Sequence, residues 1–210
     1  KADAAIMAKM APGTQLVFLY LYYAENTGSV NLTQIAKALS LSKATCTRAI
    51  NDLSASGLIS QTAEGTNKWI TTAYTKSELL EKAYGRLKTP VDRILYVKGT
   101  AQIEHPIASG IRALARQSMI GVNDQDGAIA ISKKEAAKIP AEDICTKQYF
   151  EDFGGAVIEV WSYDPIILER DGCVDDISLL LSMDNDPNER VQTCLDEIRQ
   201  KHGLPIKEEE

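Results

Sequence analysis

Two stretches near the start of the chain place apolar residues at the three-and-four spacing of helices that bury one face. The first stretch contains Leu32, Ile35, Ala36 and Leu39, and the second contains Cys46, Ala49, Ile50 and Leu53. This spacing predicts two short amphipathic helices that pack against one core.

The residues that join and follow these stretches predict a tight turn and a helix end. In Ser40-Leu41-Ser42, we expect Leu41 to fill the angle between the helices and Ser42 to cap the second one. Gly57 follows the second stretch directly, as a left-handed residue that ends a helix would. The order predicts a helix-turn-helix.

A β-hairpin is predicted next. Residues 58–60 are expected to begin a strand, and residues 69–72, Trp-Ile-Thr-Thr, are rich in strand formers. Residues 64–67, Glu-Gly-Thr-Asn, form a turn-like cluster between them. Two helices followed by a hairpin predict a winged helix.

Residues 41–59, LSKATCTRAINDLSASGLI, resemble the recognition helix and strand opening of MarR-type winged-helix transcription regulators. The resemblance covers roughly residues 14–88 and implies binding of double-stranded DNA through the second helix. MarR-type wings usually carry an arginine next to an aspartate, whereas this hairpin offers only Asn67 and Lys68 for contacts to phosphate or the minor groove. A winged helix can also serve only as a protein-interaction module.

Removing the buried stripe from residues 43–56 leaves an outward strip for DNA. With the wing, the candidate DNA-binding residues are Ser42, Lys43, Ala44, Thr45, Thr47, Arg48, Asn51, Asn67 and Lys68. The major groove is about 12 Å wide and admits one helix. Arginine reads guanine, asparagine reads adenine and methyl groups contact thymine. We therefore expect base contacts from Arg48 and Asn51, and methyl contacts from Ala44 and Thr45.

The first turn of the second helix is a candidate phosphate site. Lys43 lies there beside free helix amides, and Ser42 and Thr47 could add hydroxyl contacts. The alternative is a helix face that is merely solvated. Because Thr45, Thr47 and Asn51 are mediocre helix formers, a functional reason for their presence is favoured.

The charge of the chain is distributed unevenly. The chain has 210 residues, is 44% hydrophobic and 25% charged, and carries a formal net charge of −6. Residues 1–100 contain 12 Lys and Arg against 7 Asp and Glu, whereas residues 101–210 contain 11 against 22. Solvent screens charges beyond about 8 to 10 Å, so the basic half can bind phosphate if the acidic half lies away from the DNA.

Residues 14–24, TQLVFLYLYYA, are apolar on nearly every side. A helix of this kind is buried on several sides. It is expected either to form a homodimer contact or to lie between the two domains of one chain.

A domain boundary is predicted near Pro90. A helix over 76–87 ends before Thr89-Pro90, so we assign residues 1–90 to the winged helix-turn-helix domain and 91–210 to an acidic domain. Further strands are predicted at 93–97, 128–131 and 156–163, and further helices at 107–117, 176–182 and 187–201. This order predicts an α+β fold, with a short sheet and C-terminal helices in the second domain.

Acidic clusters in the second domain are interpreted structurally. Asp186 is expected to cap the last helix, with Pro187 in its first turn and Glu189 completing a capping box. The segment lacks the alternating oxygen ligands and central glycine of a calcium loop. The carboxylates within residues 171–176 fit a turn followed by a helix start.

Neither a metal nor another cofactor is predicted. The four cysteines, Cys46, Cys145, Cys173 and Cys194, lie far apart without a C-x-x-C pair. Reduced thiols in a cytoplasmic protein fit this spacing best, and a redox-sensing thiol remains an alternative. With only His105 and His202 as imidazole ligands, no zinc site is expected.

An enzyme and a membrane protein are both disfavoured. The chain lacks a phosphate-binding glycine loop, a metal-ligand cluster and catalytic triad spacing. No apolar run reaches the roughly 18 residues of a membrane span, and the amino terminus has no signal-peptide pattern.

The second domain offers a weaker resemblance. SGIRALARQSMI at residues 109–120, GAIAI at 127–131 and VIEVWSYDP at 157–165 are similar to the second domain of abortive-infection type IV antitoxins. This resemblance covers roughly residues 95–165. It implies an autoregulating antitoxin, or a relative reused as an ordinary repressor.

Together these features predict a sequence-specific, dimeric DNA-binding regulator with residues 43–56 in the major groove; repression is expected, and activation is the alternative. Its half-sites would lie about 34 Å apart, one helical turn of DNA. The second domain would sense a small-molecule effector or a protein partner. The alternative is an antitoxin-like module that neutralises a partner and autoregulates its own promoter.

Overall fold

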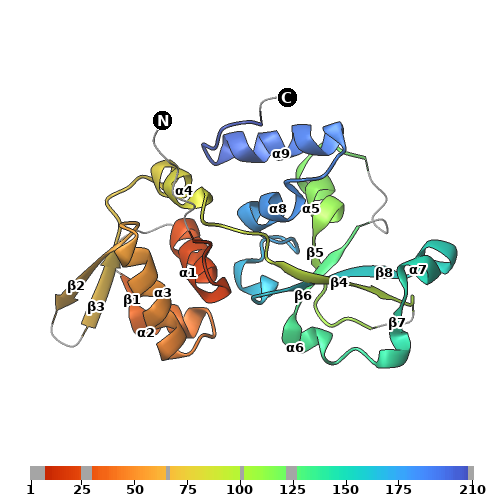
Figure 1. The fold of residues 1–210 in the computed structure, drawn as a ribbon, viewed down its shortest axis with the longest axis horizontal. Coiled ribbons are helices and arrows are strands. Elements are labelled where there is room, and N and C mark those ends of the chain that lie inside the picture. The colour runs from red at the N-terminus through yellow and green to blue at the C-terminus, as the bar shows by residue number, and fades with distance from the viewer. Residues whose placement is uncertain (1–7, 25–29, 65–66, 100–101, 122–126, 208–210) are drawn as a thin grey trace. The chain divides into compact units, whose positions relative to one another are not determined.

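The chain divides into two compact units. The structure is a computed structural model that describes residues 8–24, 30–64, 67–99, 102–121 and 127–207. Unit 1 comprises Lys1–Lys88 with Gln200–Pro205, and unit 2 comprises Thr89–Arg199 with Ile206–Glu210. Each contains helices and a sheet, which confirms the predicted α+β class (Figure 1). Among the described residues, no helix combines the length and apolarity needed to cross a bilayer.

Unit 1 combines four helices with a small antiparallel sheet. The helices are α1 (Pro12–Tyr23), α2 (Leu32–Ala38), α3 (Lys43–Ala55) and α4 (Lys76–Tyr84). The strands are β1 (Val30–Asn31), β2 (Ser60–Glu64) and β3 (Asn67–Thr71), in the order β1-β3-β2. β2 and β3 pair from Ser60↔Thr71 to Glu64↔Asn67 and form the predicted hairpin. Residues 65 and 66 of its turn lie outside the described part of the chain.

Local side-chain chemistry sets the ends of α2 and α3. The side chain of Asn31 caps α2 and forms a capping box with Gln34. The predicted cap of α3 is confirmed, because the Ser42 hydroxyl accepts a hydrogen bond of 3.1 Å from the amide of Thr45. Gly57 has φ +73° and ends α3 as predicted.

Two elements of unit 1 differ from the prediction. β2 begins at Ser60 and not at Leu58, because the Leu58 amide donates to the carbonyl of Leu53 and completes the end of α3. α4 ends at Tyr84 and not at Leu87, because the amide of Leu87 turns back to the carbonyl of Tyr84. Leu87 is nevertheless buried.

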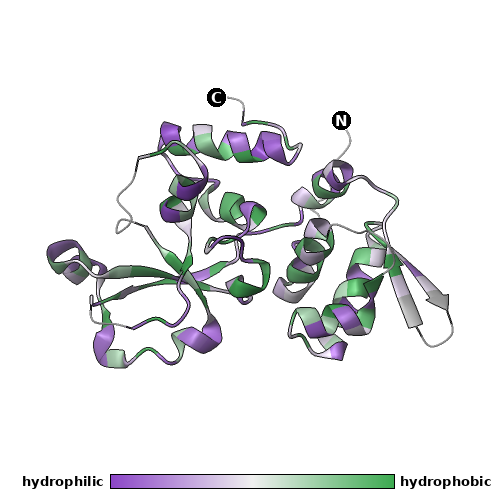
Figure 2. Ribbon diagram, turned by 180° about the vertical axis from the view of Figure 1, so that it is seen from behind, coloured by the Kyte–Doolittle hydropathy of each residue, from purple (hydrophilic) through white to green (hydrophobic). Residues whose placement is uncertain are grey.

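The core of unit 1 forms around α1, which packs against α3 and α4. Residues 16–19 of α1 are each at most 1% exposed, whereas Tyr20, Leu21 and Tyr23 are half-buried. Figure 2 shows mostly green and pale residues along α1, whereas purple and green residues mix along α3 and α4. The near-complete burial of α1 agrees with its apolar sequence, and a homodimer contact through it stays a prediction.

Unit 2 contains a five-stranded mixed sheet. Its strands are β4 (Val91–Val97), β5 (Ile107–Ala108), β6 (Ile129–Ser132), β7 (Ile144–Cys145) and β8 (Ala156–Trp161), in the order β5-β6-β8-β4-β7. β6 and β8 run parallel, and the other neighbouring strands run antiparallel. The helices are α5 (Gly110–Gln117), α6 (Lys133–Ala136), α7 (Lys147–Phe153), α8 (Asp176–Met183) and α9 (Glu189–Lys201), with 3₁₀ turns at Ala141–Asp143 and Pro165–Leu168.

The two faces of β8 have different environments. Ile158 and Val160 join an apolar cluster with Val97, Ile131 and other side chains on one face. Alternation along the strand places Glu159 and Trp161 on the opposite face. There, the hydroxyl of Ser109 donates to Glu159 next to the start of α5.

Several predicted boundaries in unit 2 were wrong, and β4 begins at Val91 and not at Arg93. Residues 107–108 pair with β6 as a strand, so α5 begins only at Gly110. β8 ends at Trp161 and not at Tyr163. α9 begins at Glu189, because the side chain of Asn188, not that of Asp186, accepts a hydrogen bond from the Arg190 amide at its start.

Candidate nucleic-acid interface

The outward face of α3 carries the candidate DNA-reading side chains. Its inward face is made of Cys46, Ala49, Ile50 and Leu53, each at most 1% exposed. The exposed candidates are Ser42, Lys43, Ala44, Arg48 and Asn51, whereas Thr45 and Thr47 are half-buried. The structure thus places Lys43, Ala44, Arg48 and Asn51 on the exposed side of α3, whereas Ser42 caps its start, Thr47 is half-buried and Thr45 faces α1.

Both the hydroxyl and the methyl group of Thr45 contact other residues of unit 1. Its hydroxyl lies 2.9 Å from the Ser42 hydroxyl and accepts a long hydrogen bond of 3.5 Å from Arg48. Its methyl group lies against α1, since a Cβ built on Gly13 would come within 2.9 Å of it. This placement disfavours the predicted contact between the Thr45 methyl group and thymine, and it leaves Ala44 as the exposed methyl group.

The hairpin approaches the outward face through a residue that sequence reasoning missed. The Gln61 side chain on β2 donates to the Asn51 side chain at 3.4 Å. No pattern in the strand sequence singles out Gln61, because the contact depends on how the hairpin folds back. Asn67 and Lys68 lie in β3 and pair with Glu64 and Ala63, and their side chains fall outside the described part.

The charges on α3 favour an anion on its exposed side. Lys43 and Arg48 lie on that side, and the one acidic residue of the helix, Asp52, forms an ion pair of 2.9 Å with Arg86. The Arg86 guanidinium therefore offsets the single negative charge on the helix. A phosphate near Lys43 would also meet the first free amides of α3.

The helices α2 and α3, the turn between them and the β2–β3 hairpin define a winged helix-turn-helix. The MarR family model matches residues 14–68, which run from α1 into β3 and contain the whole of α3. This match confirms the MarR-type resemblance for that segment. It does not extend into unit 2, and nothing in the comparisons supports the antitoxin resemblance. No curated protein and no solved structure matches the chain significantly.

The cysteines are free thiols. Cys46 and Cys173 are buried, and Cys145 and Cys194 are half-buried. Burial raises the pKa of the Cys46 thiol, which disfavours the reactive thiolate. Within the described ranges, no group of three or more His, Cys, Asp or Glu side chains is arranged to hold a metal ion.

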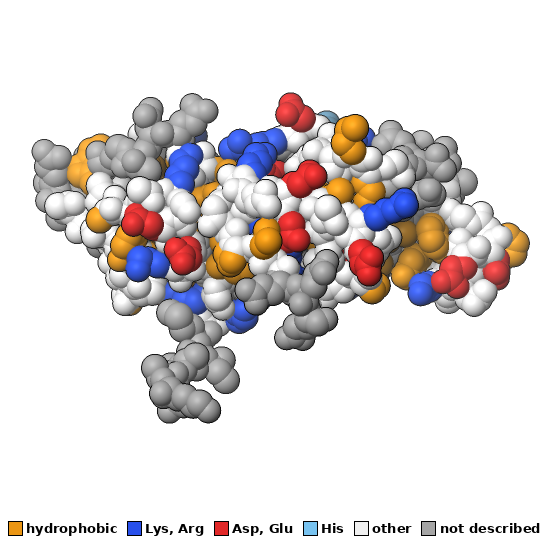
Figure 3. All heavy atoms as spheres, turned by 90° about the horizontal axis from the view of Figure 1, so that it is seen from above, with side chains coloured by type: hydrophobic (Ala, Val, Ile, Leu, Met, Phe, Trp, Pro, Cys, Tyr) orange, Lys and Arg blue, Asp and Glu red, His pale blue; other side chains and the backbone are white. Residues whose placement is uncertain are grey.

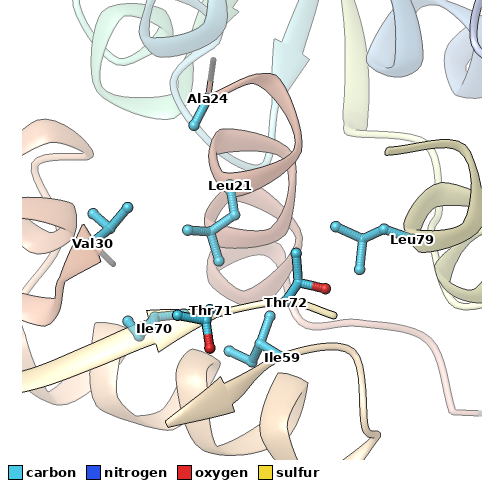
Figure 4. Close-up of a pocket in the computed structure, with 8 residues that line it drawn as sticks. All are labelled: Leu21, Ala24, Val30, Ile59, Ile70, Thr71, Thr72 and Leu79. Atoms are coloured by element: carbon cyan, nitrogen blue, oxygen red, sulfur yellow. The ribbon is translucent and has the colours of Figure 1, made fainter. Parts of the chain in front are cut away.

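An apolar hollow lies on another side of the winged helix (Figure 4). It has a volume of about 330 Å³, including space open to solvent, and lies between α1, the sheet and α4. Its lining residues are Leu21, Ala24, Val30, Ile59, Ile70, Thr71, Thr72 and Leu79. The Thr72 hydroxyl already donates to the Leu58 carbonyl at 3.0 Å, so this group is committed to the fold.

Unit 2 contains a buried carboxyl group. Glu159 is 8% exposed, and one of its oxygens accepts hydrogen bonds from the Ser109 hydroxyl and, at 3.0 Å, from the Trp161 indole. Burial raises the pKa of Glu159, and the hydrogen bonds from Ser109 and Trp161 lower it by less. The charged form is therefore disfavoured in the folded chain.

We expect Glu159→Gln to reduce the pH dependence of stability. Because the folded pKa is raised, the contribution of Glu159 is fully present below its ordinary pKa of 4.5 and is lost as the pH rises through the folded value. Between pH 4.5 and the folded pKa of Glu159, the free energy of unfolding of the wild type should fall by up to about 1.4 kcal/mol per pH unit relative to that of Glu159→Gln. Urea unfolding over a pH series would measure this difference. The exposed Glu151→Gln is the control, and parallel curves for wild type and Glu159→Gln would contradict the prediction.

Proposed function

We propose that this protein is a sequence-specific, DNA-binding transcription regulator that inserts α3 into the major groove. The observation that carries the proposal is the exposed strip from Lys43 to Asn51 on a capped helix within the MarR-like segment. The strip combines two cations with an amide side chain. These are the groups that contact phosphates and base edges in major-groove recognition.

The roles within the strip follow from position and chemistry. Arg48 and Asn51 lie almost one turn apart and would read base edges, whereas Lys43 in the first turn would bind a phosphate. The Ser42 hydroxyl already caps α3 and shares a hydrogen bond with the Thr45 hydroxyl, so only its one remaining donor or acceptor site could serve a contact to DNA. Asn67 and Lys68 of the wing would add phosphate or minor-groove contacts.

A two-fold symmetric dimer would place two copies of α3 in successive major grooves. Half-sites would then lie about 34 Å apart, and occupancy of a promoter would repress transcription sterically. Residues 1–90 would form the DNA-binding domain and residues 91–210 an effector domain. A small molecule or a protein bound there would change the spacing of the two recognition helices.

Arg48→Ala tests the reading helix. The probe is a fluorescent duplex that the wild-type chain selects from a randomised pool, and binding is measured by fluorescence anisotropy. Loss of a bidentate base contact costs about 1–3 kcal/mol, so affinity should fall about fivefold to 150-fold, and preference at one base pair should relax. Lys43→Ala should instead weaken binding to all duplexes and lower the salt slope by about 0.9.

Lys82→Ala is the control for the loss of one positive charge, because Lys82 lies on α4 over the Tyr74 ring. It should bind like the wild type. The proposed function is contradicted if selection enriches no sequence, or if Arg48→Ala and Lys43→Ala bind as the wild type does at every salt concentration.

A second candidate function is recognition of a protein partner by unit 2. The observation that favours it is a group of exposed apolar side chains on β7 and α7: Ile144 is 40% exposed, Tyr149 38% and Phe153 73%. The Tyr149 and Phe153 rings lie 4.8 Å apart. In the space-filling view, apolar side chains are visible at the right-hand end, where Figure 1 also places α7 (Figure 3). An antitoxin-like module would use such a surface, with DNA binding serving autoregulation.

A further inference from the structure

We propose that Arg86 is a positioning residue for DNA recognition, which fixes α3 by holding Asp52 against residues 85–88. This exit segment, residues 85–88, ends unit 1 before the chain passes to Thr89. The proposal rests on the proposed function, because it assigns a means of orienting the same recognition helix. It concerns contacts within unit 1 alone.

The Arg86 side chain is buried and directed at α3. Arg86 is 7% exposed, and its Nη2 donates to both Asp52 carboxylate oxygens at 2.9 and 3.0 Å. Its Nε donates to the Ala8 carbonyl at 3.2 Å, and its Nη1 is buried without a hydrogen-bond partner among the described atoms. Asp52 is therefore the only carboxylate paired with this guanidinium in the described chain. Removal of the Asp52 carboxylate would leave the buried charge of Arg86 without a counter-ion.

The exit segment that carries Arg86 is held in place by residues before α1. Lys9 Nζ donates to the carbonyls of Gly85 and Leu87 at 3.1 and 2.9 Å. The Met10 amide donates to the Arg86 carbonyl at 2.8 Å, and the Met10 side chain is buried. The backbone of Arg86 and of both its neighbours is thus held by hydrogen bonds that do not involve Asp52.

A buried amide fixes the last residue of the exit segment. The Gln15 side chain, 1% exposed on α1, donates to the Lys88 carbonyl at 2.8 Å and accepts from the Lys88 amide at 3.0 Å. Both backbone groups of Lys88 are satisfied by one side chain. The exit segment is consequently hydrogen-bonded to α1 at its last residue.

α3 is therefore held near both of its ends. Close packing of Thr45 against Gly13 holds the first turn, and the Asp52–Arg86 pair holds the last turns. Asp52 directly follows Asn51 and lies one turn after Arg48, so a rotation of α3 about its axis would displace these two side chains. Base readout needs the side chains in register with the groove, whereas phosphate attraction tolerates a small rotation.

The test compares specific with non-specific binding of the full chain. Arg86→Gln and Asp52→Asn remove the ion pair, and Arg86→Lys keeps the charge. Anisotropy is measured on the selected duplex and on a scrambled duplex over a salt series, after urea unfolding has established which variants are folded. We expect at least a tenfold loss on the selected duplex for Arg86→Gln and Asp52→Asn. We expect affinity for the scrambled duplex and the salt slope to be unchanged, and Arg86→Lys to recover most of the loss.

Each other outcome overturns the proposal in a recognisable way. A folded Arg86→Gln with wild-type affinity for the selected duplex shows that α3 needs no such fixing. Equal losses on both duplexes show a merely structural role, and a lower salt slope shows a direct phosphate contact. If Arg86→Gln does not fold, the binding of Asp52→Asn to the selected and scrambled duplexes tests the proposal in the same way. If Arg48→Ala and Lys43→Ala also bind as the wild type does, the proposed function has failed, whereas a failure confined to Arg86 and Asp52 leaves it intact.

Discussion

Ile50→Ala is expected to lower the free energy of unfolding of unit 1 by about 2–5 kcal/mol. Ile50 is 1% exposed on the inward face of α3, which packs against α1. The truncation removes apolar contacts and leaves a cavity that the surrounding helices fill only in part. Urea unfolding followed by circular dichroism would measure the change.

The adjacent Asn51→Ala is the matched control. Asn51 is exposed, so its truncation should change the free energy of unfolding by no more than about 0.5 kcal/mol. It should nevertheless weaken binding to the selected duplex by about 1–3 kcal/mol. If Asn51→Ala destabilised the chain as strongly as Ile50→Ala, the division of α3 into a core face and a reading face would be wrong.

Trp161→Ala should destabilise unit 2 by about 3–5 kcal/mol. Trp161 is 1% exposed, its ring packs edge-to-face on Tyr163 with centroids 5.8 Å apart, and its indole donates to Glu159. The substitution creates a large cavity and removes one of two donors to a buried carboxyl group. Trp161→Phe keeps an aromatic ring and should lose less than half as much.

The same variants test whether residues 1–90 and 91–210 unfold as separate domains. The chain has two tryptophans, so Trp69 on β3 becomes the sole tryptophan once Trp161 is replaced. Its fluorescence would then report on unit 1, while circular dichroism reports on the whole chain. We expect Trp161→Ala to shift part of the dichroism transition to lower urea concentrations. The unfolding midpoint reported by Trp69 fluorescence should be the same in Trp161→Ala and Trp161→Phe. A joint shift would show that the two domains unfold together.

Prediction from sequence succeeded where a signal is local. Ser42 and Gly57 specify the start and end of α3 through contacts within a few residues, and both were confirmed. Periodic burial identified the inward face of α3, including Cys46, for the same reason. The helix-turn-helix could be recognised because each of its parts carries such a signal.

Prediction failed where distant parts of the chain compete for the same residues. Ile107 and Ala108 have helix-compatible periodicity, yet pairing with β6 makes them a strand. β7 was missed because two residues give no period to detect, and they are ordered by pairing with β4. Strand direction in unit 2 could not be assigned, because the parallel pairing of β6 with β8 is a property of the assembled sheet.

The winged helix-turn-helix, the MarR-type resemblance and the strip from Lys43 to Asn51 could all be predicted from the sequence. These depend on spacing, caps and turns, which are short-range properties of the chain. Three contacts became visible only in the folded chain: Thr45 packs against α1, Gln61 reaches Asn51, and Arg86 pairs with Asp52. The last pair joins residues 34 positions apart in the sequence. Such contacts form only when the core brings distant segments together, so no local pattern encodes them.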